Sequence, residues 1–325
     1  MKIMFVDYVA YKPYSYATPK KEGLGGSEST VIRIAHGLAQ RNHETFLFNR
    51  IDTARTQIDY IYGVGHLGSD TPYPTPDVVI HIRCGTRPTY WKERFPNAKH
   101  FVWYHDSPGP WLVKEESDLE AICVSHWQKM IYEKHIPTIP DFIKRPINVI
   151  YNPVIPYPVR HQVIPGRLGF FSSPERGIER CYELYVKAKK IRPELSFAFS
   201  NPGYFADVTL PNDAINMGQL SHPRVCEEIS KCEALFYPFA FVPEAFGIVY
   251  GEANAMGTPV LACDLGAVRE VLGTGNTILA TDSTDEQIIT ALFEMLDSKP
   301  LVKADARFSI DSVLDQWEHL FYTKV

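Results

Sequence analysis

Two glutamates, Glu244 and Glu252, stand on either side of Gly247 in the stretch PEAFGIVYGEANAMGTPV. A helix beginning near Gly247 would present free backbone N–H groups and its positive dipole end, which together bind anions. Glu252 would lie in the second turn of that helix and Glu244 just ahead of its start. The spacing indicates a phosphate held by backbone amides, with sugar hydroxyls donating hydrogen bonds to the two carboxylates. The alternative is that Glu244 only complements the helix dipole and Glu252 is a surface residue.

Polar residues at three other places could join such a site. Arg83 and the pair His105-Asp106 each follow an apolar run that reads as a buried strand. Parallel strands bring their carboxyl ends to one edge of a sheet, where ligands bind in open α/β folds. Arg176 lies in a strand-to-helix turn, where it is either a phosphate ligand or a solvated turn residue. His105 is either a site residue or a satisfied histidine at a strand end.

Gly25 and Gly26 precede a helical pattern at residues 28–40, for which Ser27 is the expected N-cap. Two glycines allow a phosphate to approach the backbone closely, or they form a flexible loop before the helix. The spacing does not fit the G-x-G-x-x-G pattern of dinucleotide-binding folds, so a dinucleotide site is not favoured.

Short apolar runs alternate with helical patterns throughout the chain, which predicts two doubly wound α/β domains. The expected strands of the first domain are residues 2–6, 45–48, 58–62, 78–82, 100–104, 121–124 and 147–151, with helices at 28–40 and 125–135. The proline-rich segment 152–158 reads as a stiff connector. The expected strands of the second domain are 168–171, 195–199, 234–237, 260–262 and 278–280, with helices at 178–191, 223–231, 284–297 and 310–322.

Composition narrows the class of protein. The 325 residues carry a net charge of −5, which argues against bulk binding to nucleic acid. The six cysteines form no C-x-x-C pair and read as reduced core thiols, so we expect a cytoplasmic protein. No apolar run is long enough to span a membrane. Residues 90–95 mix aromatic and basic side chains, but Glu93 interrupts them, which favours an ordinary amphipathic surface over peripheral membrane contact.

The Glu244–Glu252 block, the two α/β domains and the proline-rich hinge resemble the GT-B glycosyltransferases. The resemblance is to family 4 of the retaining nucleotide-sugar transferases, known as glycosyl transferases group 1. It implies two Rossmann-like domains facing across a cleft. We expect an acceptor-side domain at residues 1–155, a nucleotide-sugar domain at 156–308, and a terminal helix at 309–325 that packs back on the first domain.

The resemblance also implies roles for particular residues. Glu244, His105 and Arg176 would be the catalytic residues, and Asp106 and Arg83 would lie on the acceptor side. Glu252 would bind the ribose hydroxyls. The other donor-binding residues would be Gly25, Gly26, Phe246, Gly247, Ile248 and Val249. The family's usual Lys before Gly177 is Arg176 here, and its upstream Arg is replaced near Phe171 or Ser172.

The implied reaction is transfer of a hexose from a nucleoside diphosphate to an acceptor hydroxyl of a glycan, glycoprotein or lipid-linked acceptor. Helix-start amides and Arg176 would stabilise the leaving diphosphate, so no metal and no cofactor are expected. The base pocket is expected near residues 202–204 and 220–221. Two alternatives stay open: a non-catalytic or altered nucleotide-sugar-binding relative, and another GT-B enzyme such as an epimerase.

Overall fold

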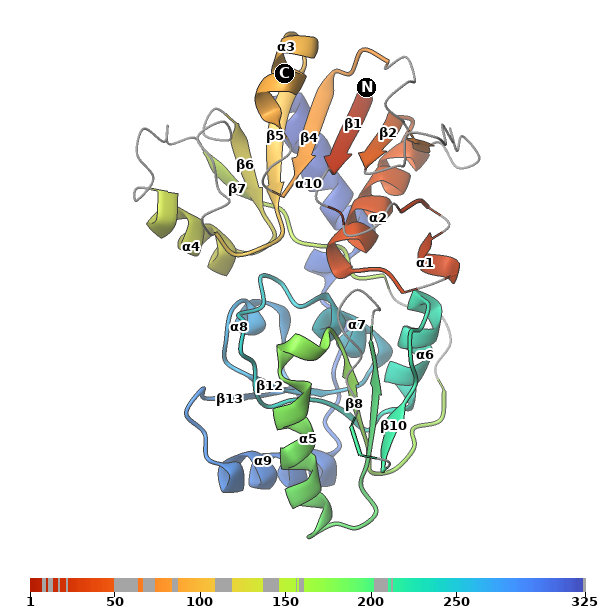
Figure 1. The fold of residues 1–325 in the computed structure, drawn as a ribbon, viewed down its shortest axis with the longest axis vertical. Helices are drawn as coiled ribbons and strands as arrows, with labels where there is room; N and C mark the ends of the chain where they lie inside the picture. Colours follow the sequence, from red (N-terminus) through yellow and green to blue (C-terminus); the bar gives the residue numbers. More distant parts are fainter. Residues whose placement is uncertain are drawn as a thin grey trace. The chain divides into compact units, whose positions relative to one another are not determined.

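The computed structural model describes residues 1–7, 10, 14–16, 18–21, 23–49, 64–66, 74–83, 87–108, 119–136, 146–155, 157, 161–201, 210–211 and 213–323. These residues form two compact units (Figure 1). Unit 1 comprises Met1–Ala17, Gly26–Pro153 and Ile310–Val325. Unit 2 comprises Thr18–Gly25 and Val154–Ser309. The chain therefore passes from one unit to the other four times.

Unit 1 is built on a parallel sheet with the strand order β3-β2-β1-β4-β5-β6-β7 over the described residues. The strands are β1 Lys2–Asp7, β2 Glu44–Asn49, β3 Val64–His66, β4 Val78–Ile82, β5 Lys99–Tyr104, β6 Glu120–Cys123 and β7 Ile147–Val149. The helices are α2 Gly26–Gln40, α3 Pro88–Arg94, α4 His126–His135 and α10 Ile310–Thr323. Every residue of β4 is buried, as expected for a strand with both faces covered.

The last helix, α10, completes unit 1 (blue in Figure 1). It packs on α2 so closely that a Cβ added at Gly37 would lie 2.6 Å from Cδ1 of Leu314. The Trp317 ring meets the Trp103 ring of β5 edge-on, with centroids 4.8 Å apart, and both side chains are fully buried. The return of the C-terminal helix to the first unit agrees with the expected fold class.

Unit 2 repeats the doubly wound arrangement with the strand order β10-β9-β8-β11-β12-β13 in its described part. The strands are β8 Arg167–Phe171, β9 Ser196–Ser200, β10 Ala214–Asn216, β11 Ala234–Tyr237, β12 Val260–Cys263 and β13 Thr277–Leu279. The helices are α1 Thr18–Lys21, α5 Ile178–Lys189, α6 His222–Lys231, α7 Ile248–Met256, α8 Val268–Val271 and α9 Asp285–Ser298, with short 3-10 turns η3 Pro174–Arg176 and η4 Ala306–Phe308.

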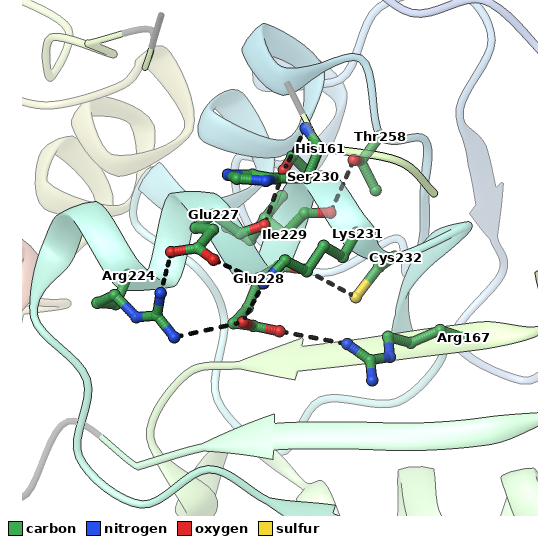
Figure 2. A network of polar contacts seen from close by, with 10 residues as sticks. All are labelled: His161, Arg167, Arg224, Glu227, Glu228, Ile229, Ser230, Lys231, Cys232 and Thr258. Carbon is green, nitrogen blue, oxygen red and sulfur yellow. Dashed lines mark hydrogen bonds and ion pairs between the residues drawn. The ribbon is translucent and has the colours of Figure 1, made fainter. Parts of the chain in front are cut away.

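A polar network fastens the C-terminal half of α6 to the rest of unit 2 (Figure 2). Arg167 of β8 donates to Glu228 at 3.2 Å, and Lys231 donates to the same carboxylate at 2.8 Å. The hydroxyl of Thr258, just ahead of β12, donates to the carbonyl of Ile229 at 2.9 Å. Glu228 is buried and paired with three cations, of which Arg224 and Lys231 lie on α6 itself. The contacts with Arg167 and Thr258 therefore hold α6 against the sheet.

The structure corrects one of the expectations about local structure. Ser27 is not an N-cap, because α2 already begins at Gly26 and Ser27 lies inside its first turn. The aromatic segment 90–95 is amphipathic, as expected: it lies in and directly after α3, with Trp91 fully buried against Phe48 and Phe95 and Tyr90 exposed. The strand expected at 58–62 lies outside the described residues. None of the described helices has the length and apolarity needed to cross a membrane.

Candidate functional site

In unit 2 the stretch that follows β11 leads into α7, as the glycine pattern predicts. Gly247 is the N-cap of α7 and has a φ of 82°, in the left-handed region that favours glycine. The predicted donor-binding residues Ile248 and Val249 are the first two residues of the helix. Phe246 is buried, with its ring 5.1 Å from that of Phe308. The N–H groups of the first turn of α7 are therefore placed to meet an anion.

Glu244 is held in place through both its backbone and its side chain. It forms an isolated parallel bridge with Gly266, and its carbonyl accepts from Ala267 at 2.8 Å. Its carboxylate lies 3.4 Å from Nη1 of Arg176, and that atom also donates to the carbonyl of Pro243 at 3.4 Å. Burial raises the pKa of Glu244, with Arg176 opposing this effect and Glu175 adding to it.

Arg176 reaches Glu244 from a tight turn. It ends η3, and the next residue, Gly177, has a φ of 102° and precedes α5. The guanidinium predicted to hold the diphosphate is therefore paired with the predicted catalytic carboxylate. With 29% of its side chain exposed, Arg176 can also be reached by a ligand.

Glu252 lies one turn into α7 and is buried. Its Oε1 is 2.7 Å from Nε2 of His222, the first residue of α6. Because His222 contacts Glu252, it belongs to the candidate site, but the sequence did not identify it. A signal was present, because residues 220–221 directly before it were assigned to the base pocket. The other part of that assignment, residues 202–204, lies outside the described residues.

In unit 1 the structure gathers three carboxylates around Arg83, and we call these four residues the Arg83 cluster. Nη2 of Arg83 lies 2.7 Å from Glu28, Nη1 lies 3.6 Å from Asp7, and Nε lies 3.4 Å from Asp106. These residues come from α2, the end of β1, and the loop after β5. Burial acts to lower the pKa of Arg83, and the carboxylates of Glu28, Asp7 and Asp106 outweigh it, so the pKa is raised. The arginine stays charged.

The backbone at Arg83 is itself unusual. Its φ is 63°, a left-handed conformation that costs a residue with a side chain on the order of 1 kcal/mol. Strain of this kind persists where the surrounding contacts dictate it, and it is enriched at functional sites. The sequence pointed to Arg83 and Asp106, but not to Asp7 or Glu28. From the sequence, Asp7 was expected in the loop after the first strand and Glu28 in the following helix, and neither was expected in a site.

His105 and Asp106 differ in exposure. The His105 ring is buried against Trp103, with centroids 4.4 Å apart, and burial first and Arg83 second lower its pKa well below the usual value. It is therefore a neutral imidazole, and its Nε2 has no hydrogen-bond partner among the described residues. The Asp106 side chain is 57% exposed, while its carbonyl accepts from Gln128 at 2.8 Å.

The two glycines of the predicted phosphate loop lie where the chain passes from one unit to the other. Gly25 is the last residue of the segment assigned to unit 2 and is buried. Gly26 is the first residue of α2 in unit 1 and is exposed. The free N–H groups at the start of this 15-residue helix offer a second anion-binding end.

The comparisons with known proteins agree with this architecture. Residues 206–310 match the family model described as glycosyl transferases group 1, and these residues include Glu244, α7 and Glu252. No curated protein sequence matches the chain.

Solved structures are similar over almost the whole chain. A sucrose-phosphate synthase from Thermosynechococcus elongatus is 14% identical, with a TM-score of 0.73 over 99% of this chain and 98% of that one. HepE of Anabaena, solved with UDP-glucose, is 16% identical, with a TM-score of 0.68 over 99% and 100%. A glycosyltransferase involved in avilamycin A biosynthesis is 16% identical, with a TM-score of 0.62 over 99% and 97%. The chain has the GT-B fold of these structures, and the family match supports glycosyl transfer.

Proposed function

We propose that this protein is a retaining hexosyltransferase that moves a sugar from a nucleoside-diphosphate sugar to an acceptor hydroxyl. The observation that carries the proposal is the start of α7, where Gly247 caps a helix and Arg176 and Glu244 lie beside it. The family match over residues 206–310 and the UDP-glucose bound to HepE support a nucleotide-sugar donor.

The donor would bind to unit 2. N–H groups of the first turn of α7 would hold the diphosphate, and Arg176 would stabilise the charge that develops as the sugar departs. Glu252 would accept hydrogen bonds from the ribose hydroxyls, and Glu244 would accept them from the sugar. When the diphosphate binds to Arg176, the guanidinium divides its contacts between the diphosphate and Glu244. The contact with Glu244 weakens, and this carboxylate can turn toward the sugar.

The Arg83 cluster would serve the acceptor in unit 1. Asp106 is the exposed carboxylate and would accept the proton of the attacking hydroxyl. Neutral His105 would contact a sugar hydroxyl through Nε2, which has no hydrogen-bond partner in the described part of the chain. We assign no protein nucleophile, and we propose that neither a metal nor a cofactor takes part in transfer.

A panel of nucleotide sugars, beginning with UDP-glucose, tests this proposal through release of the nucleoside diphosphate. We expect release from at least one donor, unchanged turnover in EDTA, and a product that keeps the anomeric configuration of the donor. Glu252→Ala should weaken donor binding by about 1.5–3 kcal/mol, the worth of hydrogen bonds to a charged group. Loss of turnover in EDTA, or unchanged donor affinity in Glu252→Ala, would contradict the assignment.

A second function is a non-catalytic module that binds nucleotide sugars. One observation favours it: Arg176 is paired with Glu244. The guanidinium that would bind the diphosphate is therefore already engaged by a carboxylate. Calorimetric binding of UDP-glucose without release of UDP from any donor would favour the binding module over the enzyme.

A further inference from the structure

Three side chains of different chemistry meet where α6 packs on α7. His222 and Cys226 are four residues apart on α6, so they lie on one face of the helix. Nε2 of His222 is 3.5 Å from Sγ of Cys226 and 2.7 Å from Oε1 of Glu252. All three donor atoms lie within 4.8 Å of one another, and this is the group of potential metal ligands found in the described part of the chain.

Imidazole, thiolate and carboxylate together favour a transition metal over Mg²⁺ or Ca²⁺, which prefer oxygen ligands. Around a tetrahedral Zn²⁺, bond lengths of about 2.0–2.3 Å place neighbouring ligand atoms roughly 3.3–3.6 Å apart. The distance between Nε2 and Sγ already has this value. The distance between Nε2 and Oε1 would have to widen by roughly 0.6 Å, and the carboxylate would have to approach the sulfur.

Helix α6 provides one fixed ligand, Cys226, and one adjustable ligand, His222. The network of Figure 2 fastens α6 downstream of Cys226, because Glu228 accepts from Arg167 of β8 and the carbonyl of Ile229 accepts from Thr258. His222 stands at the opposite end, as the first helical residue, with 24% of its side chain exposed. Cys226 and Glu252 are buried, so an ion would enter from the imidazole side, and water could occupy a fourth position there.

We propose that His222, Cys226 and Glu252 bind a transition-metal ion such as Zn²⁺, and that the bound ion competes with nucleotide for Glu252. Binding releases the thiol proton of Cys226 to solvent and requires the neutral tautomer of His222 that carries its proton on Nδ1, so the ligands are a thiolate, a neutral imidazole and a carboxylate. The competition rests on the proposed role of Glu252, whereas metal binding does not. The ion would be an inhibitor of the proposed transfer rather than a participant in it.

Co²⁺ is the probe for the site, because a cobalt–thiolate bond gives a charge-transfer absorption that carboxylate and imidazole ligands do not give. We expect this band to saturate at one Co²⁺ per chain and to disappear on addition of Zn²⁺. Cys226→Ser should abolish the band, and His222→Ala should weaken Zn²⁺ binding by about 100-fold or more. The matched control is Cys181→Ser, because Cys181 is also a fully buried thiol on a helix of unit 2.

Absence of the band, or an equal band in Cys226→Ser, would overturn the proposal. An equal loss in Cys181→Ser would also overturn it, because the effect would then reflect disturbed folding. Circular dichroism of each variant shows whether its fold is kept.

The competition is tested by measuring the affinity for UDP with and without Zn²⁺, in the wild type and in Cys226→Ser. We expect Zn²⁺ to weaken UDP binding at least tenfold in the wild type and much less in the variant. An equal effect in both proteins would mean that Zn²⁺ acts by chelating UDP, and the competition would be wrong. If Co²⁺ binds as expected but no donor is turned over, the metal site stands and the proposed transferase activity fails; the reverse result removes only the metal site.

Discussion

The carboxylates of the two candidate sites differ in how many basic partners they have. In unit 2 Glu244 pairs with Arg176 and Glu252 pairs with His222, one basic group to each acid. In unit 1 three carboxylates share the single guanidinium of Arg83. A one-to-one pair can exchange its basic partner for a ligand. Loss of Arg83 would leave the buried carboxylates of Asp7 and Glu28 without this guanidinium, which is unfavourable for buried negative charge.

Because of this difference, substitutions in the two units should have different effects. We expect changes in the pairs of unit 2 to alter ligand affinity and turnover while the fold persists. We expect changes in the Arg83 cluster to alter the free energy of unfolding first.

The largest effect is expected for Arg83→Ala. The variant removes the guanidinium beside fully buried Asp7, so the free energy of unfolding should fall by about 3–5 kcal/mol. Urea denaturation measures this loss. Alanine keeps a Cβ, so the left-handed backbone at position 83 costs about the same in both proteins and does not offset this loss.

Arg41 provides a matched control for that experiment. It also contacts three carboxylates, those of Asp311, Asp315 and Glu318 on α10. Here Asp311 and Asp315 are 84% and 71% exposed, so Arg41→Ala should cost only about 1 kcal/mol. Equal losses for Arg41→Ala and Arg83→Ala would show that burial does not set the difference.

Acid should act on unit 1 through a pair of stacked histidines. Nε2 of His100 donates to the carbonyl of Phe95 at 3.1 Å, so its Nδ1 accepts from Nε2 of His81 at 3.2 Å. Burial, followed by His100 and Lys92, lowers the pKa of His81 to about 3, and burial also lowers the pKa of His100. Both rings are therefore neutral in the folded protein.

In the unfolded chain these histidines take up protons near pH 6.5. Their contribution to stability is therefore complete above about pH 6.5 and is lost as the pH falls toward 3, by about 1.4 kcal/mol per pH unit for His81 alone. Urea denaturation at about pH 7 and about pH 5 measures the slope. The slope is proportional to the number of protons taken up on unfolding, and His81→Phe should lower that number by roughly one. An unchanged slope would mean that His81 is protonated in the folded protein.

Arg176→Ala tests the exchangeable pair in unit 2. We expect donor kcat/KM to fall by about 10- to 100-fold, since a charged hydrogen bond to the diphosphate is lost. The free energy of unfolding should change by less than about 1 kcal/mol, because the pair is partly exposed. Arg192→Ala, which removes a surface pair with Asp297, is the control and should leave turnover unchanged. A large loss of stability in Arg176→Ala would contradict the proposed difference between this pair and the Arg83 cluster.

The smallest effect concerns the start of α7. A Cβ at Gly247 would lie 2.6 Å from Cδ2 of Tyr250 at a φ of 82°, so Gly247→Ala should cost about 1–2 kcal/mol. Gly218 also has a positive φ, of 61°, but a Cβ there would meet nothing within 4 Å. Gly218→Ala isolates the backbone cost, and thermal unfolding compares the two. Equal shifts in Tm would show that the contact with Tyr250 is unimportant.

The same contrast explains what could be predicted from the sequence. The start of α7 is encoded in one continuous stretch, and the apolar periods around it predicted both doubly wound sheets. Positions of turns and caps were less predictable, because Ser27 was assigned as a cap on composition alone, whereas α2 begins one residue earlier at Gly26.

The Arg83 cluster could be predicted only in part, because its contacts are distant in the sequence. Glu28 is 55 residues from Arg83, and the carboxylate of Asp7 reads as the unremarkable end of a strand. His222 was missed for a related reason, since its partner Glu252 lies 30 residues further on and on another helix. Pairings of this kind follow from sheet order and helix packing, and no local pattern encodes them.

Helix α10 has a consequence for how the protein is made. On the ribosome, all of unit 2 emerges before residues 310–323, so unit 1 lacks α10 until after unit 2 has been synthesised. During that interval Trp103 and the close-packing surface around Gly37 lack the cover that Trp317 and Leu314 provide in the finished protein. The nascent chain therefore offers a transient apolar surface on which a chaperone could act.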